Sequence, residues 1–154
     1  MVKYVPLASI NKKEKKNMST RVEDRRESKI QYLATMQDLV ALVWFYMGKC
    51  PKHSRFIYQT KICDVANDCY IHLQIANTIF LKDEDDKKRK RGHLLEALGL
   101  INALESLLSI VMSVLMKEGN DNQGKRYISD AAFERMGKVI SEERTLICGV
   151  LKNS

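Results

Sequence analysis

Three histidines and four cysteines are the side chains of this sequence that could bind a metal or act as nucleophiles. Cys50 and His53 flank Pro51 in a C-x-x-H pattern that could supply two metal ligands. A structural zinc site needs four ligands, and the remaining candidates, Cys63 and Cys69, fall on an expected helix that buries at least Cys69. We therefore interpret the cysteines as buried thiols that pack like small hydrophobic side chains, and we expect no metal site.

Patterns typical of catalysis are missing from the sequence. There is neither a Gly-rich phosphate loop nor a G-x-S-x-G turn that would expose a nucleophilic serine. The Glu-x-x-His pairs that hold iron ions in helical bundles do not occur either. A Cys/His nucleophile pair would need a cleft and a third group to orient the base, and no motif supplies these. We expect a protein that is not an enzyme and has no cofactor.

The most basic run of the sequence stands at the expected start of the third helix. It consists of Lys87, Lys88, Arg89, Lys90 and Arg91. Consecutive residues point all round a helix, so several of these cations must face solvent, where they attract phosphates regardless of base sequence. Acidic residues 83–86 could instead neutralise the run through i,i+4 pairs, which contribute only ~0.2–0.5 kcal/mol each. The sequence leaves both interpretations open.

A second basic group surrounds the expected turn between the first two helices. It comprises Lys49, Lys52 and Arg55, and it could form another surface for nucleic acid or be an ordinary solvated turn. The net charge is +7, and residues 1–29 carry nine Lys/Arg against four Asp/Glu. Charge placed in this way favours an anionic partner. Because this N-terminal segment has few large apolar residues to insert into lipid, we expect the partner to be RNA or DNA and not a membrane.

Apolar residues spaced three and four apart predict an all-α domain of four helices over residues 21–152. Gly48 and Pro51 separate the first two helices, and Ser129 could cap the fourth. Short connections predict an antiparallel up-down-up-down bundle. The expected elements are a basic flexible arm over residues 1–20 and helices over about 20–49, 52–81, 86–118 and 129–151.

The first helix is expected to contact more than its own bundle. Its expected core seam is Ile30, Leu33, Gln37, Val40, Trp44 and Met47. After Asp38 the helix is apolar nearly all round, and such a helix needs cover on every side. One core covers one side, so the rest is expected to face another subunit of a homo-oligomer. The expected contact residues are Leu39, Leu42, Val43, Phe45 and Tyr46.

The sequence predicts a cytoplasmic protein. The N-terminus lacks the apolar run of a signal peptide, so disulfides are not expected. The longest apolar run without a charge, Ser106 to Met116, is too short to span a bilayer, and Glu96 and Glu105 interrupt anything longer. Whether Met18 is an alternative start stays open.

Several short motifs resemble those of a known family. They are Pro51-Lys52-x-x-Arg55-Phe56, Lys61-Ile62-x-x-Val65-Ala66, Arg91-x-x-Leu94-Leu95-Glu96-Ala97-Leu98, Lys125-x-Tyr127, Met136-Gly137 and Cys148-Gly149-Val150-Leu151-Lys152. In order and spacing, residues 28–152 resemble the four-helix-bundle family of the accessory variability determinant (Avd) of diversity-generating retroelements. The proteins encoded in ribosomal-RNA intervening sequences are related to it.

This resemblance implies a function that composition does not. Avd-like proteins are homopentamers with a basic surface that binds a reverse transcriptase and its template RNA. They assist mutagenic complementary-DNA synthesis and carry out no catalysis themselves. The resemblance therefore implies a non-enzymatic accessory subunit. The alternative is a structural or protein-interaction bundle of the intervening-sequence type, with no direct role in nucleic-acid binding.

Overall fold

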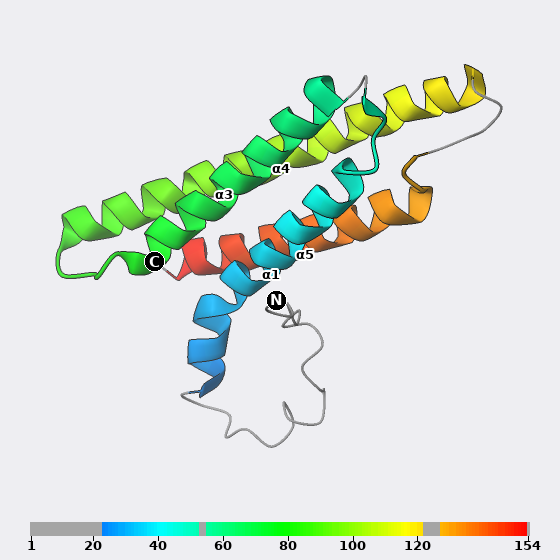
Figure 1. Cartoon of the computed structure of the whole chain (residues 1–154). Helices are drawn as coiled ribbons and strands as arrows, with labels where there is room; N and C mark the ends of the chain where they lie inside the picture. Colours follow the sequence, from blue (N-terminus) through cyan, green and yellow to red (C-terminus); the bar gives the residue numbers. More distant parts are fainter. Residues whose placement is uncertain (1–22, 53–54, 122–126, 154) are drawn as a thin grey trace, which may run out of the picture.

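The computed structural model describes residues 23–52, 55–121 and 127–153, so the expected arm of residues 1–20 lies outside the described residues. Within these ranges the chain forms helices and no strands. Four helices pack together (Figure 1), which confirms the all-α fold of four helices. The elements are α1 Glu23–Met47, the π-helical turn η3 Arg55–Gln59, α3 Thr60–Thr78, α4 Glu84–Asp121 and α5 Asp130–Lys152.

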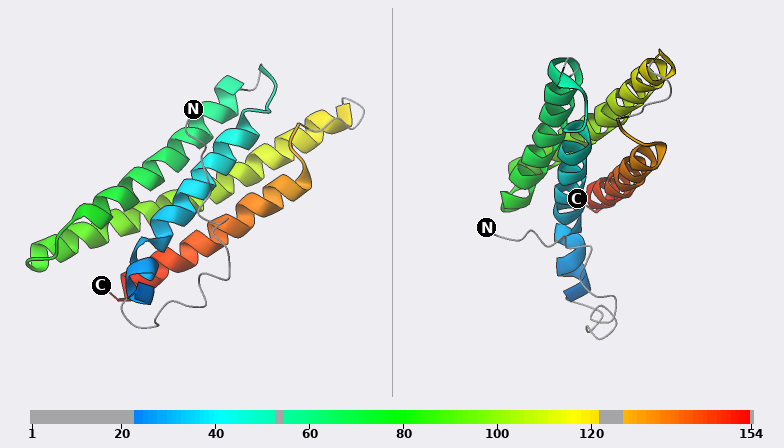
Figure 2. Two further views of the ribbon diagram at one scale, coloured as in Figure 1. Left: turned by 60° about the horizontal axis from the view of Figure 1, so that its bottom comes forward. Right: turned by 45° about the vertical axis from the view of Figure 1, so that its right-hand side comes forward.

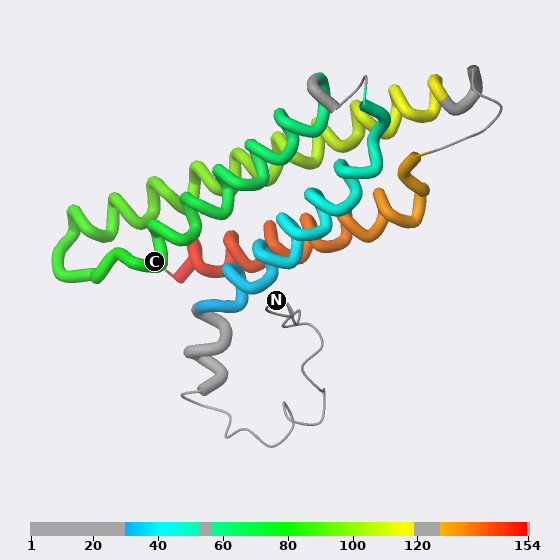
Figure 3. Tube along the Cα trace, viewed as in Figure 1, coloured from blue at the N-terminus to red at the C-terminus, as the bar shows by residue number. Residues whose placement is uncertain are grey.

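The longest helix, α4, packs against both α3 and α5. Its 38 residues span ~57 Å at about 1.5 Å per residue. The first helix, α1, packs on α3 and α5 in turn, so that segments from the two ends of the described chain lie side by side (Figure 2). The tube in Figure 3 shows that α1 ends and α3 begins at one end of the molecule, whereas α3 ends and α4 begins at the opposite end.

Short polar side chains fix the starts of α4 and α5. Ser129 has an extended backbone, and its Oγ accepts a hydrogen bond from the Ala132 N–H at 3.2 Å. Asp83 acts in the same way ahead of α4, since its Oδ1 accepts a hydrogen bond from the Asp86 N–H at 2.9 Å. Each bond satisfies a backbone donor that has no partner within its helix. The expected cap at Ser129 is confirmed.

The second long helix is shorter than the sequence predicted. It ends at Thr78, whose Oγ1 donates a hydrogen bond to the Ile75 carbonyl at 2.8 Å, and Ile79 is extended. The predicted end at Leu81 is therefore wrong by three residues. Phe80, which falls within the predicted helix of residues 52–81, is 82% exposed in the connection to α4.

The core seam of α1 differs from the predicted one. Ile30 and Trp44 are 54% and 53% exposed, so they lie outside the core. Because this helix is apolar on most sides, spacing alone could not select the buried side. Among the residues of α1 whose burial the structure describes, 30–47, the buried ones are Tyr32, Met36, Leu39, Val43 and Met47.

By length and composition, α4 could cross a membrane over Glu84–Glu118, which the sequence analysis did not anticipate. The finding is weak evidence, because a core helix of a soluble protein passes the same test. Leu94, Ile101 and Leu104 on this helix are fully buried in the four-helix core. The cytoplasmic location stays a prediction.

Candidate nucleic-acid interface

The predicted basic run lies on the first turns of α4 and is mostly exposed. Lys87, Lys88, Arg89 and Arg91 are exposed, whereas Lys90 is half-buried. Lys87 Nζ lies 3.0 Å from Glu84 Oε1, and both side chains are more than half exposed. An exposed ion pair of this kind contributes only ~0–1 kcal/mol, so a phosphate could replace Glu84.

Two of the neighbouring acidic residues have a structural role at the helix start. Asp83 accepts the hydrogen bond from the Asp86 backbone, and Asp86 Oδ2 accepts one from the Lys82 backbone N–H at 3.2 Å. Negative charge at a helix N-terminus is favoured by the helix dipole. These two carboxylates therefore cap the start of α4. Lys88 and Arg89, by contrast, have no ion pair or hydrogen bond with any other described residue.

Arg91 joins the start of α4 to the end of α5. Its Nη1 donates a hydrogen bond to the Leu151 carbonyl at 3.1 Å, across 60 positions of sequence. Carbonyls in the last turn of a helix lack partners within it and attract cations. The contact brings the exposed Lys152 to the same end of the molecule. Sequence reasoning missed Lys152, because only packing relates the two helix ends.

We define the α4 basic patch as Lys87, Lys88, Arg89, Lys90 and Lys152. The other predicted basic group lies at the far end of the molecule, beside the end of α1 (Figure 1). There, Lys49 Nζ lies 4.5 Å from the ring centroid of Phe45, which is a cation–π contact. Lys52 is exposed, and the Arg55 side chain lies outside the described residues. The two basic groups are therefore separate surfaces.

Only some of the residues predicted to contact another subunit lie on the surface. Leu39 and Val43 are fully buried in the core of their own chain, so they cannot contact a second subunit, and their assignment to the interface is corrected. Leu42 and Tyr46 are half-buried. Phe45 is 59% exposed. Of the predicted residues, Phe45 offers the largest exposed apolar side chain to a partner.

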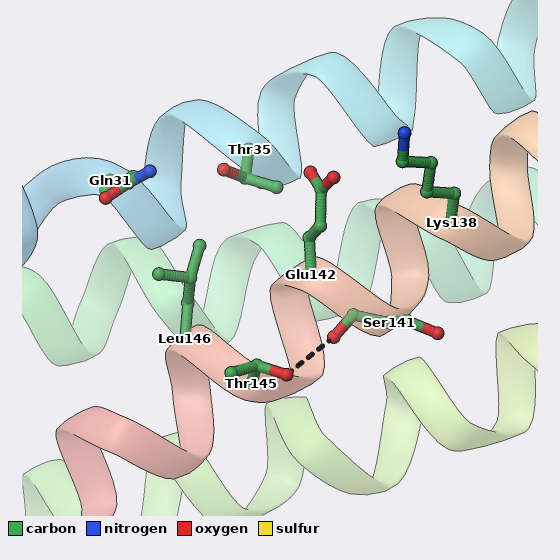
Figure 4. A pocket seen from close by; sticks show the side chains of 7 residues that line it. All are labelled: Gln31, Thr35, Lys138, Ser141, Glu142, Thr145 and Leu146. Atoms are coloured by element: carbon green, nitrogen blue, oxygen red, sulfur yellow. Dashed lines mark hydrogen bonds between the residues drawn. The ribbon is translucent and has the colours of Figure 1, made fainter.

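An open groove runs between α1 and α5 (Figure 4). Gln31 and Thr35 line it from α1, and Lys138, Glu142 and Leu146 line it from α5. Thr145 Oγ1 donates a hydrogen bond to the Ser141 carbonyl at 3.0 Å, as helical threonines commonly do.

A buried carboxyl group lies on α5 in the core. Glu143 is 0% exposed, and neither carboxyl oxygen has a hydrogen-bond partner among the residues that the structure describes. Burial raises the pKa of Glu143 to about 9, because the core disfavours the charged form. Burial, and then the charge of Glu143, raises the pKa of Cys69 to about 12 and also raises the pKa of Tyr32. The sequence held a signal for this burial, since Glu143 lies three residues after Ile140 and four before Ile147, on one face of the helix.

Two histidines meet between α3 and α4. The Nδ1 atoms of His72 and His93 are 3.0 Å apart, and their ring planes are inclined by 35°. No spacing rule could pair residues 21 positions apart on different helices. Among the residues that the structure describes, no group of three or more His, Cys, Asp or Glu could hold a metal ion. Cys50 and Cys69 are buried, and all four cysteines are free thiols.

Comparison of the chain with protein-family models, curated proteins and solved structures gives no match.

Proposed function

We propose that this protein is a non-enzymatic accessory subunit of a diversity-generating retroelement. It binds phosphates of template RNA or complementary DNA through the α4 basic patch and docks a reverse transcriptase. The observation that carries the nucleic-acid role is the exposure of Lys88 and Arg89 without ion pairs to described residues, with Lys152 at the same end of the molecule. The role in the retroelement rests on the motif resemblance.

The finer architecture is part of the proposal. The four helices run up-down-up-down, and copies of the chain associate into a ring-like homo-oligomer, a pentamer by resemblance. The short connection between α3 and α4, residues 79–83, supports the antiparallel order, because short links join antiparallel neighbours. Exposed Trp44 and Phe45 support a contact between copies, since large apolar side chains that lie together on a surface often mark an interface.

The patch is tested by reversing two charges. Lys88→Glu combined with Arg89→Glu should weaken binding of mixed-sequence RNA at about 0.15 M salt. It should also reduce the slope of log affinity against log salt by about 0.7–0.9 for each phosphate contact that is lost. Fluorescence anisotropy measures both quantities, and the melting temperature should not fall.

The matched control reverses two exposed charges of the same kinds on α5, Arg135→Glu with Lys138→Glu. It changes the net charge equally, so only position differs. Equal loss of RNA affinity in the two double variants would assign binding to net charge and remove the patch from the proposal.

Partner identity is tested by co-purification from the host. Recovery of a reverse transcriptase together with one abundant RNA is the expected result. Recovery of an oligomer with neither would contradict the retroelement role.

The second candidate function is a protein-interaction bundle of the intervening-sequence type. The observation that favours it is the number of large apolar side chains on the surface, including Ile71, Ile75 and Leu95. In that case RNA binding would be undetectable at about 0.15 M salt, where weak phosphate contacts are screened.

A further inference from the structure

Phe80 is the most exposed of the large apolar side chains whose burial the structure describes. It is 82% exposed, and Leu81 beside it is 51% exposed. Apolar area left in water costs about 25 cal/mol for each Å². Among the described residues, no side chain forms a ring contact or a cation–π contact with Phe80. Packing within its own chain therefore does not explain an aromatic ring at this position.

Hydrogen bonds hold Phe80 beside the first turn of α4. The Lys82 N–H donates to the Phe80 carbonyl at 3.1 Å and to Asp86 Oδ2 at 3.2 Å. Asp86 is itself held by Asp83, whose Oδ1 accepts the hydrogen bond from the Asp86 N–H. The connection from α3 is thereby tied to α4, so the fold determines where Phe80 lies relative to the start of that helix.

Phe80 lies close to the α4 basic patch. The chain advances four residues, at no more than ~3.6 Å each, from Phe80 to Glu84, the first residue of α4. Lys88 follows about one helical turn later, after a rise of ~6 Å. The Cα atoms of Phe80 and Lys88 are therefore ~20 Å apart at most. A strand of the length that single-strand binding sites accept, about 4–16 nucleotides, can contact both.

We propose that Phe80 is a base-stacking residue and that the α4 basic patch takes single-stranded nucleic acid. The inference rests on the proposed function, in which this patch binds phosphates. Surfaces for single strands combine cations that follow the backbone with aromatic rings on which bases stack. Lys88 and Arg89 supply the cations, and Phe80 supplies the ring. In a duplex the bases stack on each other, so their faces are closed to Phe80.

The surroundings of Phe80 favour a nucleotide over a protein partner. Residues 82–85, which follow Leu81, are all charged and exposed. Charged residues are depleted at the centre of protein–protein interfaces, where a large aromatic side chain would be buried. A nucleotide presents an aromatic face to the ring and a phosphate to the neighbouring cations, so it matches this mixture better.

The test compares Phe80→Ala with the wild type on two probes, an oligouridine of about 12 nucleotides and a duplex RNA of the same length. Fluorescence anisotropy should show that Phe80→Ala binds the oligouridine roughly 5-fold to 150-fold more weakly. Affinity for the duplex and the slope of log affinity against log salt should not change, because no phosphate contact is lost. Phe80→Trp should restore the affinity for the oligouridine. The melting temperature of Phe80→Ala should not fall, since the ring is exposed.

Tyr127→Ala is the matched control. Tyr127 is 46% exposed and lies shortly before α5, which begins at the end of the molecule opposite the start of α4 (Figure 1). It should bind the oligouridine as the wild type does. Equal affinity of Phe80→Ala and Tyr127→Ala for the oligouridine would overturn the stacking role.

The charge-reversal variant separates this failure from a failure of the proposed function. If Lys88→Glu with Arg89→Glu still weakened binding while Phe80→Ala did not, the patch would keep its phosphate role and Phe80 would lose its role in stacking. A wild type that binds neither probe would contradict the proposed function and the stacking role with it.

Fluorescence of Phe80→Trp supplies a second measurement. An indole that stacks on a base loses emission, so the oligouridine should quench this variant. The wild type, whose only tryptophan is Trp44, should keep its emission. Equal emission changes in the two chains would overturn the proposal. A smaller mass of Phe80→Ala in light scattering, with unchanged affinity for the oligouridine, would overturn it as well and assign Phe80 to a contact between protein chains.

Discussion

The Glu143 side chain links the stability of the core to pH. Its carboxyl group is buried in the core, where the described residues give its oxygens no hydrogen-bond partner. The pKa rises from 4.5 in water to about 9 in the folded chain, because burial disfavours the anion. The folded chain therefore binds this proton more tightly than the unfolded chain does. The stabilisation from the protonated group is complete below pH 4.5 and is lost as the pH rises toward 9.

Glu143→Gln should remove this pH dependence. In the wild type, this group should lower the free energy of unfolding from pH 5 to pH 8 by at most ~1.4 kcal/mol for each pH unit. The glutamine variant keeps a similar volume and does not titrate, so its unfolding free energy should change less over that range. Urea denaturation at the two pH values measures the difference.

Glu142→Gln is the control for this experiment, because the neighbouring Glu142 is exposed. It should retain the wild-type dependence on pH. If Glu143→Gln retained it as well, the ionisation of Glu143 would not be the cause.

At the scale of single elements, the two later helices begin where side chains satisfy backbone donors. Ser129 and Asp83 each accept a hydrogen bond from a residue three positions ahead. The end of α3 is different, since Thr78 bonds back to its own helix and Ile79 leaves in an extended conformation. Local side-chain chemistry therefore determines the residues at which α4 and α5 begin. The residue at which α3 ends was harder to predict from the sequence.

Ser129→Ala should destabilise the protein by ~1 kcal/mol, because the Ala132 N–H loses its side-chain acceptor and keeps only the Ser129 carbonyl at 3.1 Å. The melting temperature and urea midpoint should both fall. Ser141→Ala is the matched control, since Ser141 is exposed within the same helix and alanine favours helix there. If the two variants were equally stable, the cap would make no net contribution.

At the scale of the whole molecule, α1 contributes side chains both to the core and to the surface. One side inserts Leu39 and Val43 into the core, and another exposes Trp44 and Phe45. Trp44 Nε1 donates a hydrogen bond to Asn67 Oδ1 on α3 at 3.0 Å, so its indole is held across α1 and α3. Phe45 lies under Lys49 and has most of its ring exposed. This arrangement separates side chains that stabilise the fold from those free to contact another copy.

Phe45→Glu should dissociate the proposed oligomer and leave the fold intact, because it places a charge in the contact between copies and none in the core. Light scattering coupled to size exclusion should report a smaller mass, with an unchanged helical circular-dichroism spectrum. Leu39→Ala should instead destabilise the fold by ~2–5 kcal/mol, because it leaves a cavity in the core.

A wild-type chain that is monomeric at micromolar concentration would contradict the assembly. So would a Phe45→Glu variant of unchanged mass.

Periodicity in the sequence determined much of the fold. The four helices and the Ser129 cap were predicted from neighbouring residues, because helix spacing and capping act over a few positions. The exposure of several cations in residues 87–91 was also expected, since five consecutive residues point all round a helix, and Lys88 and Arg89 are among the exposed ones.

Tertiary structure decided what depends on contacts between helices. The buried side of α1 was selected by its neighbours, because its own pattern is apolar on most sides. Lys152 joined the α4 basic patch through the Arg91–Leu151 hydrogen bond, and His72 met His93 only once α3 lay against α4. Each of these pairs is distant in sequence, and the chain encodes such proximity only through packing of the whole core.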